Sequence, residues 1–460
     1  MENILKFEII NPSTEEILST YESETSHEVS LKVDLSFTAF NTWKKVEISH
    51  RKSLMLGLAK ILLARKEEFA KLIAQEMGKP IKAGILEIER CALVMEYYAN
   101  NAKDFLKAKE IKTKMKKSLV SYQPLGVILA IMPWNYPFWQ VFRFAAPNIM
   151  AGNVALLKHA PNTFGAGVMI QEIFEEAGFP KGVFQNLIID TSIAAEVIAN
   201  PKVSGVTLTG SERAGSAVAA LAAKNLKKSV LELGGSDPYI VLKDANLDLA
   251  AKNIVKSRLN NSGQVCISAK RVIADEKIHD ELIVKISNLV KEYKVGDPLD
   301  INTQCGPLAR KDLQIKVQEQ VNESVLCGAK ILLGGKMVEK KGYYFQPTIL
   351  VNVKPGMPAF DDEIFGPVIS IISAKDENDA IYLANNTRFG LSAAIFTSDL
   401  QRGEYLATHE VQAGSCFVNS MSSSNPLLPF GGIKCSGFGR ELSIDGMLEF
   451  MNVKTIGICE

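Results

Sequence analysis

The chain has 460 residues, more than one hydrophobic core usually supports, so two or three closely packed domains are expected. With 47% apolar residues, 22% charged residues and a formal net charge of +1, nothing in the composition favours binding to nucleic acid or to an anionic membrane. Residues 1–12 lack a signal-peptide pattern, and no stretch reaches the roughly 18 apolar residues of a membrane span, which predicts a cytoplasmic protein.

The cysteines argue against both disulfides and a metal site. They are odd in number, scattered, and without a Cys-x-x-Cys pair or a histidine at metal-ligand spacing. Most are therefore interpreted as small buried hydrophobic residues, and any one proposed as a nucleophile needs local support. The seven are Cys91, Cys266, Cys305, Cys327, Cys416, Cys435 and Cys459.

The first hundred residues are predicted to be mostly helical after a short extended start. Apolar residues recur at helical spacing over 54–77 and predict one packing helix that ends near Gly78. A second amphipathic helix is predicted over about 81–107. The basic stretch 107–117 is interpreted as a solvated connection that leads into a short strand at 119–122.

From Gly126 onward, short apolar runs alternate with helical stretches, a pattern typical of parallel β-sheets covered by helices. The first alternation predicts strands at 127–132, 154–157, 183–188 and 203–208, and helices at 138–150, 166–177 and 193–199. The second begins near Ser236 and predicts strands at 239–242, 271–274, 331–333 and 368–372, and helices at 249–260 and 279–293. Such sheets bind ligands beyond the carboxyl ends of their strands, in a cleft that we expect between the two domains.

Two residues near predicted turns are suited to nucleophilic and base chemistry. Cys266 follows the polar turn 260–265, which predicts an exposed thiol whose pKa is lowered by backbone N–H groups that can also hold an oxyanion. Glu232 ends an apolar run beside Gly234, and in a partly dry cleft its pKa can rise toward neutrality, as a general base requires. Taken alone, a structural cysteine and an ion-paired carboxylate are the simpler interpretations.

Residues 206–215 are predicted to form a strand, a turn that contains Gly210 and Ser211, and the start of a helix. The backbone donors of such a turn and the helix dipole favour a pyrophosphate group. The glycine spacing differs from the three-glycine dinucleotide fingerprint, so the turn alone does not identify its ligand.

Seven motifs, in order along nearly the whole chain, together resemble the aldehyde dehydrogenase superfamily. The amino-acid sequence of residues 131–140, 157–162 and 232–237 is similar to that of the bacterial Sad-type succinate-semialdehyde dehydrogenases [NAD(P)+]. The seven motifs are Pro133-Trp-Asn135, Lys158, Thr209-Gly-Ser211, Glu232-Leu-Gly-Gly235, Gly263-Gln-Val-Cys266, Glu363-Ile-Phe-Gly-Pro367, and Pro429-Phe-Gly-Gly-Ile-Lys434 with Ser436-Gly-Phe-Gly-Arg-Glu441.

The resemblance implies an α/β fold with a Rossmann-type cofactor domain, an α/β catalytic domain and a small oligomerisation β-extension. The implied segments are 1–106 and 124–234 for the NAD(P)-binding domain, 235–430 for the catalytic domain, and 107–123 with 442–460 for oligomerisation. The C-terminal part is expected to be a helix followed by an extended stretch at 452–458, which in the family extends the sheet of a neighbouring subunit. A homodimer or homotetramer is therefore expected.

The resemblance also implies a catalytic set. Cys266 would attack the aldehyde, and the side-chain amide of Asn135 and the Cys266 backbone N–H would hold the oxyanion. Glu232 would activate the water that hydrolyses the thioester, and Glu441 would relay protons. No metal is implied.

NAD or NADP is the implied cofactor. NAD-preferring members often carry a glutamate three residues after the motif lysine, where this chain has Pro161, so NADP is admissible and Lys158 with His159 can supply positive charge. The implied cofactor residues are Lys158 at the adenosine ribose, Gly210 and Ser211 at the pyrophosphate, Glu363 at the nicotinamide ribose, and Trp134, Gly234 and Phe365 beside the site.

For the substrate, the resemblance implies a small acid-bearing aldehyde. Arg143 lies eight residues after Asn135, where succinate-semialdehyde dehydrogenases carry an arginine that clamps the far carboxylate. A surface arginine on a helix is the alternative interpretation. Some relatives carry a second arginine at the place of Asn260, and the polar loop 419–425 is expected to narrow the substrate path.

Three other functions stay open from the sequence. The thioester could pass to coenzyme A, the aldehyde could be glutarate semialdehyde or an apolar one, or the chain could be a scaffold without turnover. Glu232 favours water as the acceptor, Arg143 favours an acid-bearing aldehyde, and the joint presence of Cys266, Asn135 and Glu363 disfavours a retired scaffold.

Overall fold

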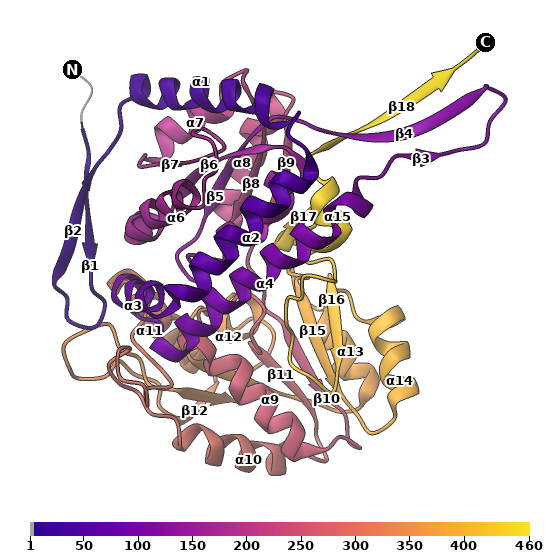
Figure 1. The fold of residues 1–460 in the computed structure, drawn as a ribbon. Helices are drawn as coiled ribbons and strands as arrows, with labels where there is room; N and C mark the ends of the chain where they lie inside the picture. Colours follow the sequence, from indigo (N-terminus) through magenta and orange to yellow (C-terminus); the bar gives the residue numbers. More distant parts are fainter. Residues whose placement is uncertain (1–3) are drawn as a thin grey trace.

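The computed structural model describes residues 4–460, so the first three residues of the predicted 1–106 segment lie outside the described part. Two mainly parallel β-sheets with their covering helices form the body, and a three-stranded sheet projects from it as an arm (Figure 1). Both parallel sheets were predicted from the alternating pattern, and both are confirmed. The predicted domain boundaries stay a prediction.

The N-terminal part is a β-hairpin followed by four helices. The strands β1 (Lys6–Ile10) and β2 (Ile17–Glu22) pair antiparallel, and the helices are α1 (Ser26–Trp43), α2 (Ile48–Ala64), α3 (Lys66–Met77) and α4 (Ile81–Phe105). The single helix predicted over 54–77 is wrong, because the chain breaks at Arg65 (φ −110°, ψ 19°). Both α2 and α3 bury one face, so the apolar spacing continues across a one-residue break that it cannot reveal.

The first parallel sheet has the strand order β17-β9-β8-β5-β6-β7, with β17 as its antiparallel edge. Its helix α5 packs on β5, on β6 and on α4. The strands are β5 (Val127–Met132), β6 (Val154–His159), β7 (Phe184–Leu187), β8 (Val203–Thr209), β9 (Lys228–Glu232) and β17 (Gly437–Phe438). The helices are α5 (Trp139–Ala151), α6 (Phe164–Glu176), α7 (Thr191–Ala199) and α8 (Glu212–Lys224), and a short 3₁₀ helix η1 covers Pro161–Thr163.

The second sheet has the order β12-β13-β14-β11-β10-β15-β16, with only β12 antiparallel. Its strands are β10 (Pro238–Val241), β11 (Arg271–Asp275), β12 (Lys330–Leu333), β13 (Thr348–Val351), β14 (Val368–Ala374), β15 (Ser392–Phe396) and β16 (Ser415–Val418). Its helices are α9 (Leu247–Leu259), α10 (His279–Lys291), α11 (Lys311–Leu326), α12 (Pro358–Asp361), α13 (Glu377–Asn385) and α14 (Leu400–Tyr405). The strands β13, β15 and β16 were not predicted, because a short apolar run cannot be distinguished from a buried helix segment by periodicity alone.

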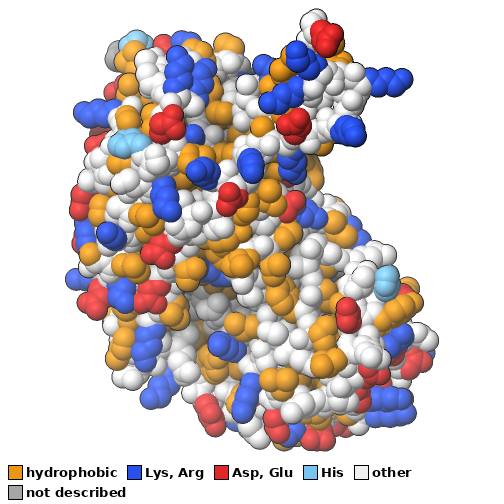
Figure 2. Space-filling view, turned by 45° about the vertical axis from the view of Figure 1, so that its right-hand side comes forward, with side chains coloured by type: hydrophobic (Ala, Val, Ile, Leu, Met, Phe, Trp, Pro, Cys, Tyr) orange, Lys and Arg blue, Asp and Glu red, His pale blue; other side chains and the backbone are white. Residues whose placement is uncertain are grey.

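The projecting arm consists of β3 (Lys109–Glu110), β4 (Lys117–Pro124) and β18 (Met451–Ile458), and α15 (Ser443–Leu448) precedes β18. The predicted strand 119–122 and the predicted extended stretch 452–458 fall within β4 and β18, which pair with each other in the same chain. The basic stretch 107–117 is therefore part of the arm rather than a plain connection. Figure 2 shows lysine and arginine side chains gathered over this arm, above a recess in the surface.

None of the helices in residues 4–460 combines the length and apolar character that a bilayer crossing needs.

A fully buried ion pair between Glu87 of α4 and Lys79, two residues before that helix, lies at the start of α5. The Glu87 carboxylate pairs with Lys79 and accepts hydrogen bonds from the backbone N–H groups of Phe138 (2.9 Å) and Trp139 (3.0 Å). We expect Glu87→Ala to lower the free energy of unfolding by about 3–5 kcal/mol, because it leaves the Lys79 charge buried without a partner. Denaturant unfolding followed by circular dichroism measures the loss.

The matched control is Glu89→Ala on the same helix. Glu89 pairs with Lys66 at 2.5 Å, but both side chains are more than one-third exposed, so its loss should cost less than about 1 kcal/mol. Equal losses in the two variants would contradict the role given to the buried pair.

Candidate active site

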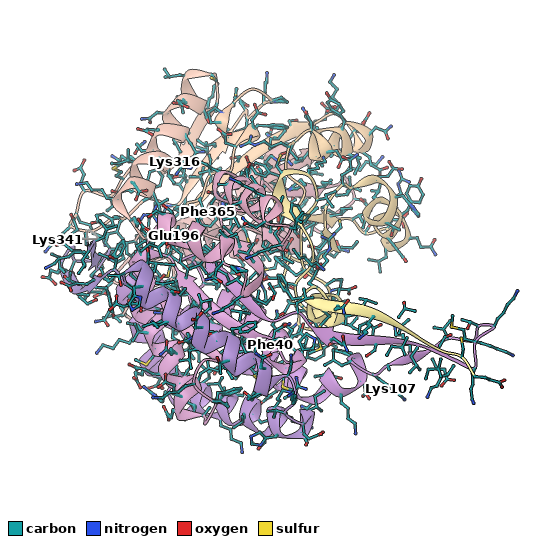
Figure 3. The ribbon with its side chains drawn as sticks, turned by 90° about the horizontal axis from the view of Figure 1, so that it is seen from above. Phe40, Lys107, Glu196, Lys316, Lys341 and Phe365 are labelled. Atoms are coloured by element: carbon teal, nitrogen blue, oxygen red, sulfur yellow. The ribbon has the colours of Figure 1, made fainter. Side chains whose placement is uncertain are left out.

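A cleft of about 580 Å³ opens where the first sheet faces residues of the second half of the chain. Its first wall follows the carboxyl ends of β5, β8 and β9, and its second includes Lys316 and Phe365, which Figure 3 labels. The prediction that ligands would be bound beyond these strand ends matches the position of the cleft. A cavity of this size suits a cofactor or other small molecule.

A smaller cavity of about 100 Å³ adjoins the cleft. It is lined by Arg90, Trp139, Arg143 and Phe430, and by the segment Met421–Ser424 of the polar loop that was predicted to narrow the substrate path. Cys266 and Gln140 are the two residues in the walls of both cavities. The candidate nucleophile therefore stands at the junction between a large and a small binding space.

The turn before Cys266 has an unusual backbone that fits it against a distant motif. Asn261 and Ser262 have left-handed conformations (φ 49° and 55°), and Gly263 has a φ of 77°. A Cβ on Gly263 would lie 2.1 Å from the carbonyl oxygen of Gly366, so only glycine fits there. The motif that ends at Cys266 and the motif 363–367 are thus packed directly against each other.

The Cys266 thiol is not the exposed, acidic thiol that its turn predicted. Burial raises its pKa to about 11, and the nearby charges of Lys270 and Arg143 only partly oppose this effect. The turn prediction failed because loss of solvent outweighs the electrostatic benefit of neighbouring donors. In the resting protein the sulfur is a neutral thiol.

Two buried cations hold this region together, and the sequence reading assigned neither of them a role. Arg258 on α9 donates to the backbone oxygen of Ile364 (2.7 Å) and to Ser268 Oγ (2.7 Å), and it also contacts the Gly263 carbonyl oxygen (3.3 Å). An arginine on the buried face of an amphipathic helix was the available signal, because such a residue needs internal acceptors.

Lys270, the second of these cations, lies at the start of β11. Its Nζ donates to the backbone oxygens of Val265 (2.9 Å) and Cys266, and it forms an ion pair with Glu363 Oε1 at 3.0 Å. This lysine connects the nucleophile turn to the predicted ribose-binding carboxylate. Its side chain is buried, so the connection is shielded from solvent.

Glu232 is placed at the end of β9, in the interior of the molecule. It is 2% exposed, and neither carboxylate oxygen has a hydrogen-bond partner among the described residues. Burial and the neighbouring Glu441 raise its pKa well above the ordinary value, in the direction that the sequence predicted. A carboxyl group in this condition can take up a proton readily.

Arg143 lies in the wall of the small cavity, but its positive charge is already paired with a carboxylate of the protein. Its guanidinium forms an ion pair with Glu441 and lies 4.6 Å from the centre of the Phe430 ring. Burial raises the pKa of Glu441, and Arg143 opposes that shift. Arg143 is a core residue rather than a surface arginine, since its side chain is 2% exposed.

Asn135 lies beside the nucleophile turn, in the wall of the large cleft. Its Nδ2 donates to the backbone oxygen of Gln264 (3.1 Å), and the backbone carbonyl oxygen of Asn135 accepts from Asn261 Nδ2 (2.9 Å). A primary amide has two N–H groups, so one donor of Asn135 stays available for a ligand.

The predicted cofactor residues divide into two groups. Trp134, Gly210, Ser211, Gly234, Glu363 and Phe365 all line the large cleft. The rings of Trp134 and Phe365 meet edge to face at 5.7 Å, and Ser211 caps α8 by accepting from Ala214 N (3.3 Å). A Cβ on Gly234 would lie 2.3 Å from Glu363 Oε2, so a side chain there would displace the Glu363 carboxylate.

Lys158 and His159 form the other group. Lys158 lies near the end of β6, is buried and does not line the cleft, and burial lowers the pKa of its ammonium group. The expectation that His159 adds positive charge is wrong, because burial lowers its pKa to about 4. Its ring nitrogens bond to the Pro137 carbonyl oxygen (2.9 Å) and to Thr163 Oγ1 (2.8 Å), so it is a structural, neutral histidine.

Comparison with known proteins agrees with this geometry. Residues 2–456 match the Aldehyde dehydrogenase family. A probable succinate-semialdehyde dehydrogenase [NADP(+)] of Synechocystis is 44% identical over 98% of this chain and 99% of its own length. The succinate semialdehyde dehydrogenase [NAD(P)+] Sad of Escherichia coli is 43% identical over 97% of this chain and 96% of its own.

Solved structures agree as well. The succinic semialdehyde dehydrogenase of Streptococcus pyogenes in complex with NADP+ superposes with a TM-score of 0.97 at 36% identity, covering 99% of this chain and 100% of that one. An NAD-dependent aldehyde dehydrogenase of Sinorhizobium meliloti superposes with a TM-score of 0.96 at 34% identity, covering 99% and 91%. The chain described here belongs to the aldehyde dehydrogenase family.

Proposed function

We propose that this protein oxidises succinate semialdehyde, or a similar small acid-bearing aldehyde, to the carboxylic acid with NAD or NADP. The observation that carries the proposal is the place of Cys266 at the junction of the two cavities, with arginines in the wall of the smaller one. The names of the most similar relatives support the same substrate.

The large cleft fits a nicotinamide dinucleotide. Its volume is about 580 Å³, and it contains the first residues of α8, a 13-residue helix whose N-terminal N–H groups suit a pyrophosphate. Gly210 and Ser211 would hold the phosphates, Glu363 a ribose, and Trp134 and Phe365 the edge of the site. Lys158 would act at the adenosine ribose, and Pro161 places no carboxylate three residues later, so a 2′-phosphate is tolerated.

The first half of the reaction depends on Cys266 and Asn135. The sulfur of Cys266 forms a bond to the aldehyde carbon, and its proton passes to a base in the cleft. The free N–H of the Asn135 amide and the Cys266 backbone N–H hold the oxyanion that develops. A nicotinamide cofactor bound in the cleft would supply the hydride acceptor that oxidation of this adduct to the thioester requires.

The second half depends on Glu232. Its carboxylate takes a proton from a water molecule, the water oxygen adds to the thioester carbon, and the carbon–sulfur bond breaks. The carboxylic acid leaves the site, and the sulfur of Cys266 is regenerated as a thiolate. Glu441, held by Arg143, relays the proton away from Glu232, and Arg143 also faces the substrate's far carboxylate from the cavity wall.

Nicotinamide reduction at 340 nm with succinate semialdehyde and with butanal tests the proposal. We expect kcat/KM to favour the semialdehyde by about 10- to 100-fold, the effect of one charge-assisted contact. Equal rates with both aldehydes would reject the acid-bearing substrate. A requirement for coenzyme A would instead point to acyl transfer, the alternative that the presence of Glu232 disfavours.

We also propose that the protein is a homodimer or homotetramer that associates through the arm, and a cytoplasmic location stays a prediction. Strand β18 lies at one edge of the order β18-β4-β3, so its outer backbone groups can pair with another chain. Four apolar side chains of the arm are substantially exposed in the single chain: Ile111, Met115, Val453 and Ile458. Exposed apolar groups of this kind mark interaction surfaces.

Val453→Asp should shift the protein toward smaller assemblies, because it places a charge in the proposed contact, where Val453 is 60% exposed in the single chain. Light scattering coupled to size-exclusion chromatography measures the mass. The matched control is Leu226→Asp, which changes an apolar residue that is 96% exposed and lies outside the arm. A monomeric wild-type protein at micromolar concentration would refute the proposal.

A further inference from the structure

Two arginines line the small cavity beside Cys266, and only one of them has a carboxylate partner in the protein. The two are Arg90 and Arg143, and no aspartate or glutamate lines the cavity. Arg143 is neutralised by Glu441. Within residues 4–460 no carboxylate lies within ion-pair distance of Arg90. Glu87, three residues earlier on α4, is already paired with Lys79.

The Arg90 side chain is held in place at two points. Its guanidinium lies 4.4 Å from the centre of the Trp139 ring, and its Nη2 donates to the backbone oxygen of Ser424 in the polar loop. A guanidinium has five N–H donors, and the contact with Ser424 uses one of them. Arg90 is therefore preorganised, with donors left for a planar acceptor such as a carboxylate.

The charge of Arg90 is also poorly compensated by solvent. Burial is the main influence that lowers the pKa of its guanidinium, and the nearby Arg143 acts in the same direction. An arginine nevertheless stays protonated in proteins, so a partly buried guanidinium without a carboxylate partner is energetically unfavourable. A negatively charged ligand would remove that cost, whereas a neutral aldehyde would not.

We propose that Arg90 binds the far carboxylate of an acid-bearing aldehyde in the small cavity and thereby determines the substrate class. The inference rests on the proposed function and deepens it, because it assigns the anchoring role to α4 rather than to Arg143 alone. Ser423 and Asn260 line the same cavity, and their side-chain donors can complete the shell around the carboxylate, whereas the Ser422 hydroxyl already bonds to Ser392 Oγ and to the Ala393 carbonyl oxygen. Arg143 keeps its contact with Glu441 when the substrate binds.

The test compares Arg90→Met, Arg90→Lys and wild type with succinate semialdehyde and with butanal. Methionine keeps much of the apolar stem against Trp139 and removes the charge. The ratio of the two kcat/KM values should fall about 10- to 100-fold in Arg90→Met, mainly through KM for the semialdehyde, and partly recover in Arg90→Lys. Lys82→Met is the control, since Lys82 is an exposed cation on the same helix.

A second readout does not depend on turnover. Succinate, the product, should slow the alkylation of Cys266 by iodoacetamide in wild type and in Lys82→Met, and this protection should be lost in Arg90→Met. Circular dichroism confirms that each variant is folded.

The outcomes separate the two proposals. If wild type prefers the semialdehyde and Arg90→Met keeps both the preference and the succinate protection, the role of Arg90 is refuted while the proposed function stands. If Arg90→Met slows both aldehydes equally, Arg90 only supports the helix and the inference also fails. If wild type shows no preference at all, the proposed function falls and the inference falls with it.

Discussion

Cys266→Ser should lower the rate of aldehyde oxidation by roughly 10⁴-fold or more, because a serine hydroxyl at this position has no base strong enough to make it an effective nucleophile. The thiol itself needs a base to remove its proton before it can attack, since its pKa of about 11 keeps it neutral at physiological pH. Steady-state reduction of nicotinamide at 340 nm measures the loss. Cofactor binding, followed by fluorescence quenching, should persist in the variant because the sulfur does not hold the dinucleotide.

The control for this variant is Cys327→Ser, which changes an exposed cysteine that lines neither cavity. It should keep wild-type activity. Alkylation gives an independent check: the rate at Cys266 should rise about tenfold per pH unit up to its pKa, because only the thiolate reacts. An alkylation rate at Cys266 that is already constant from pH 7 would contradict the neutral resting thiol.

Glu232→Gln should allow the first half of the reaction and block the second. We expect a burst of about one equivalent of reduced nicotinamide per active site, followed by turnover about 10²- to 10⁴-fold slower than wild type. The amide fills the same space but cannot accept the proton of the hydrolytic water. Rapid-mixing absorbance at 340 nm detects the burst, and mass spectrometry of the quenched protein detects the acyl group on Cys266.

The pH dependence of hydrolysis follows from the raised pKa of Glu232. A base works only when ionised, so hydrolysis should accelerate as pH rises toward and through that pKa, and the variant should lose this limb. Glu196→Gln, a change at an exposed glutamate of α7, should preserve both the rate and the profile. Slow turnover of Glu232→Gln without a burst would mean that Glu232 acts before the thioester forms.

The sequence predicted the two parallel sheets because alternating strands and helices leave a strong periodic signal. Of the predicted site residues, Cys266, Asn135 and Glu363 lie in the wall of the cleft, whereas Glu232, Glu441 and Lys158 do not, and the roles given to all of them stay predictions. The break at Arg65 was missed because the apolar spacing continues across it, and the strands β15 and β16 were missed because a short apolar run cannot be distinguished from a buried helix segment by periodicity alone.

The sequence alone does not determine the protonation state of an ionisable group after folding has buried it. The prediction for the pKa of Cys266 had the wrong sign because desolvation depends on packing from distant residues. His159 was read as a cation for the same reason. Nothing in the sequence singles out Arg90, because its role depends on Glu441 pairing with Arg143 and leaving Arg90 without a carboxylate partner, which only the three-dimensional structure reveals.

The contact between Gly263 and Gly366, with Arg258 bonded to both segments, also affects the order in which the protein matures on the ribosome. About a hundred residues separate the two segments, so the turn that carries Cys266 leaves the exit tunnel well before the segment that shapes it. Until then the cysteine lies in an unfinished, more solvated turn. A nascent chain stalled between the two segments should therefore have a Cys266 thiol that labelling reagents modify faster than they do in the finished protein, and the rate should fall to that of the finished protein once the segment up to Pro367 has left the tunnel.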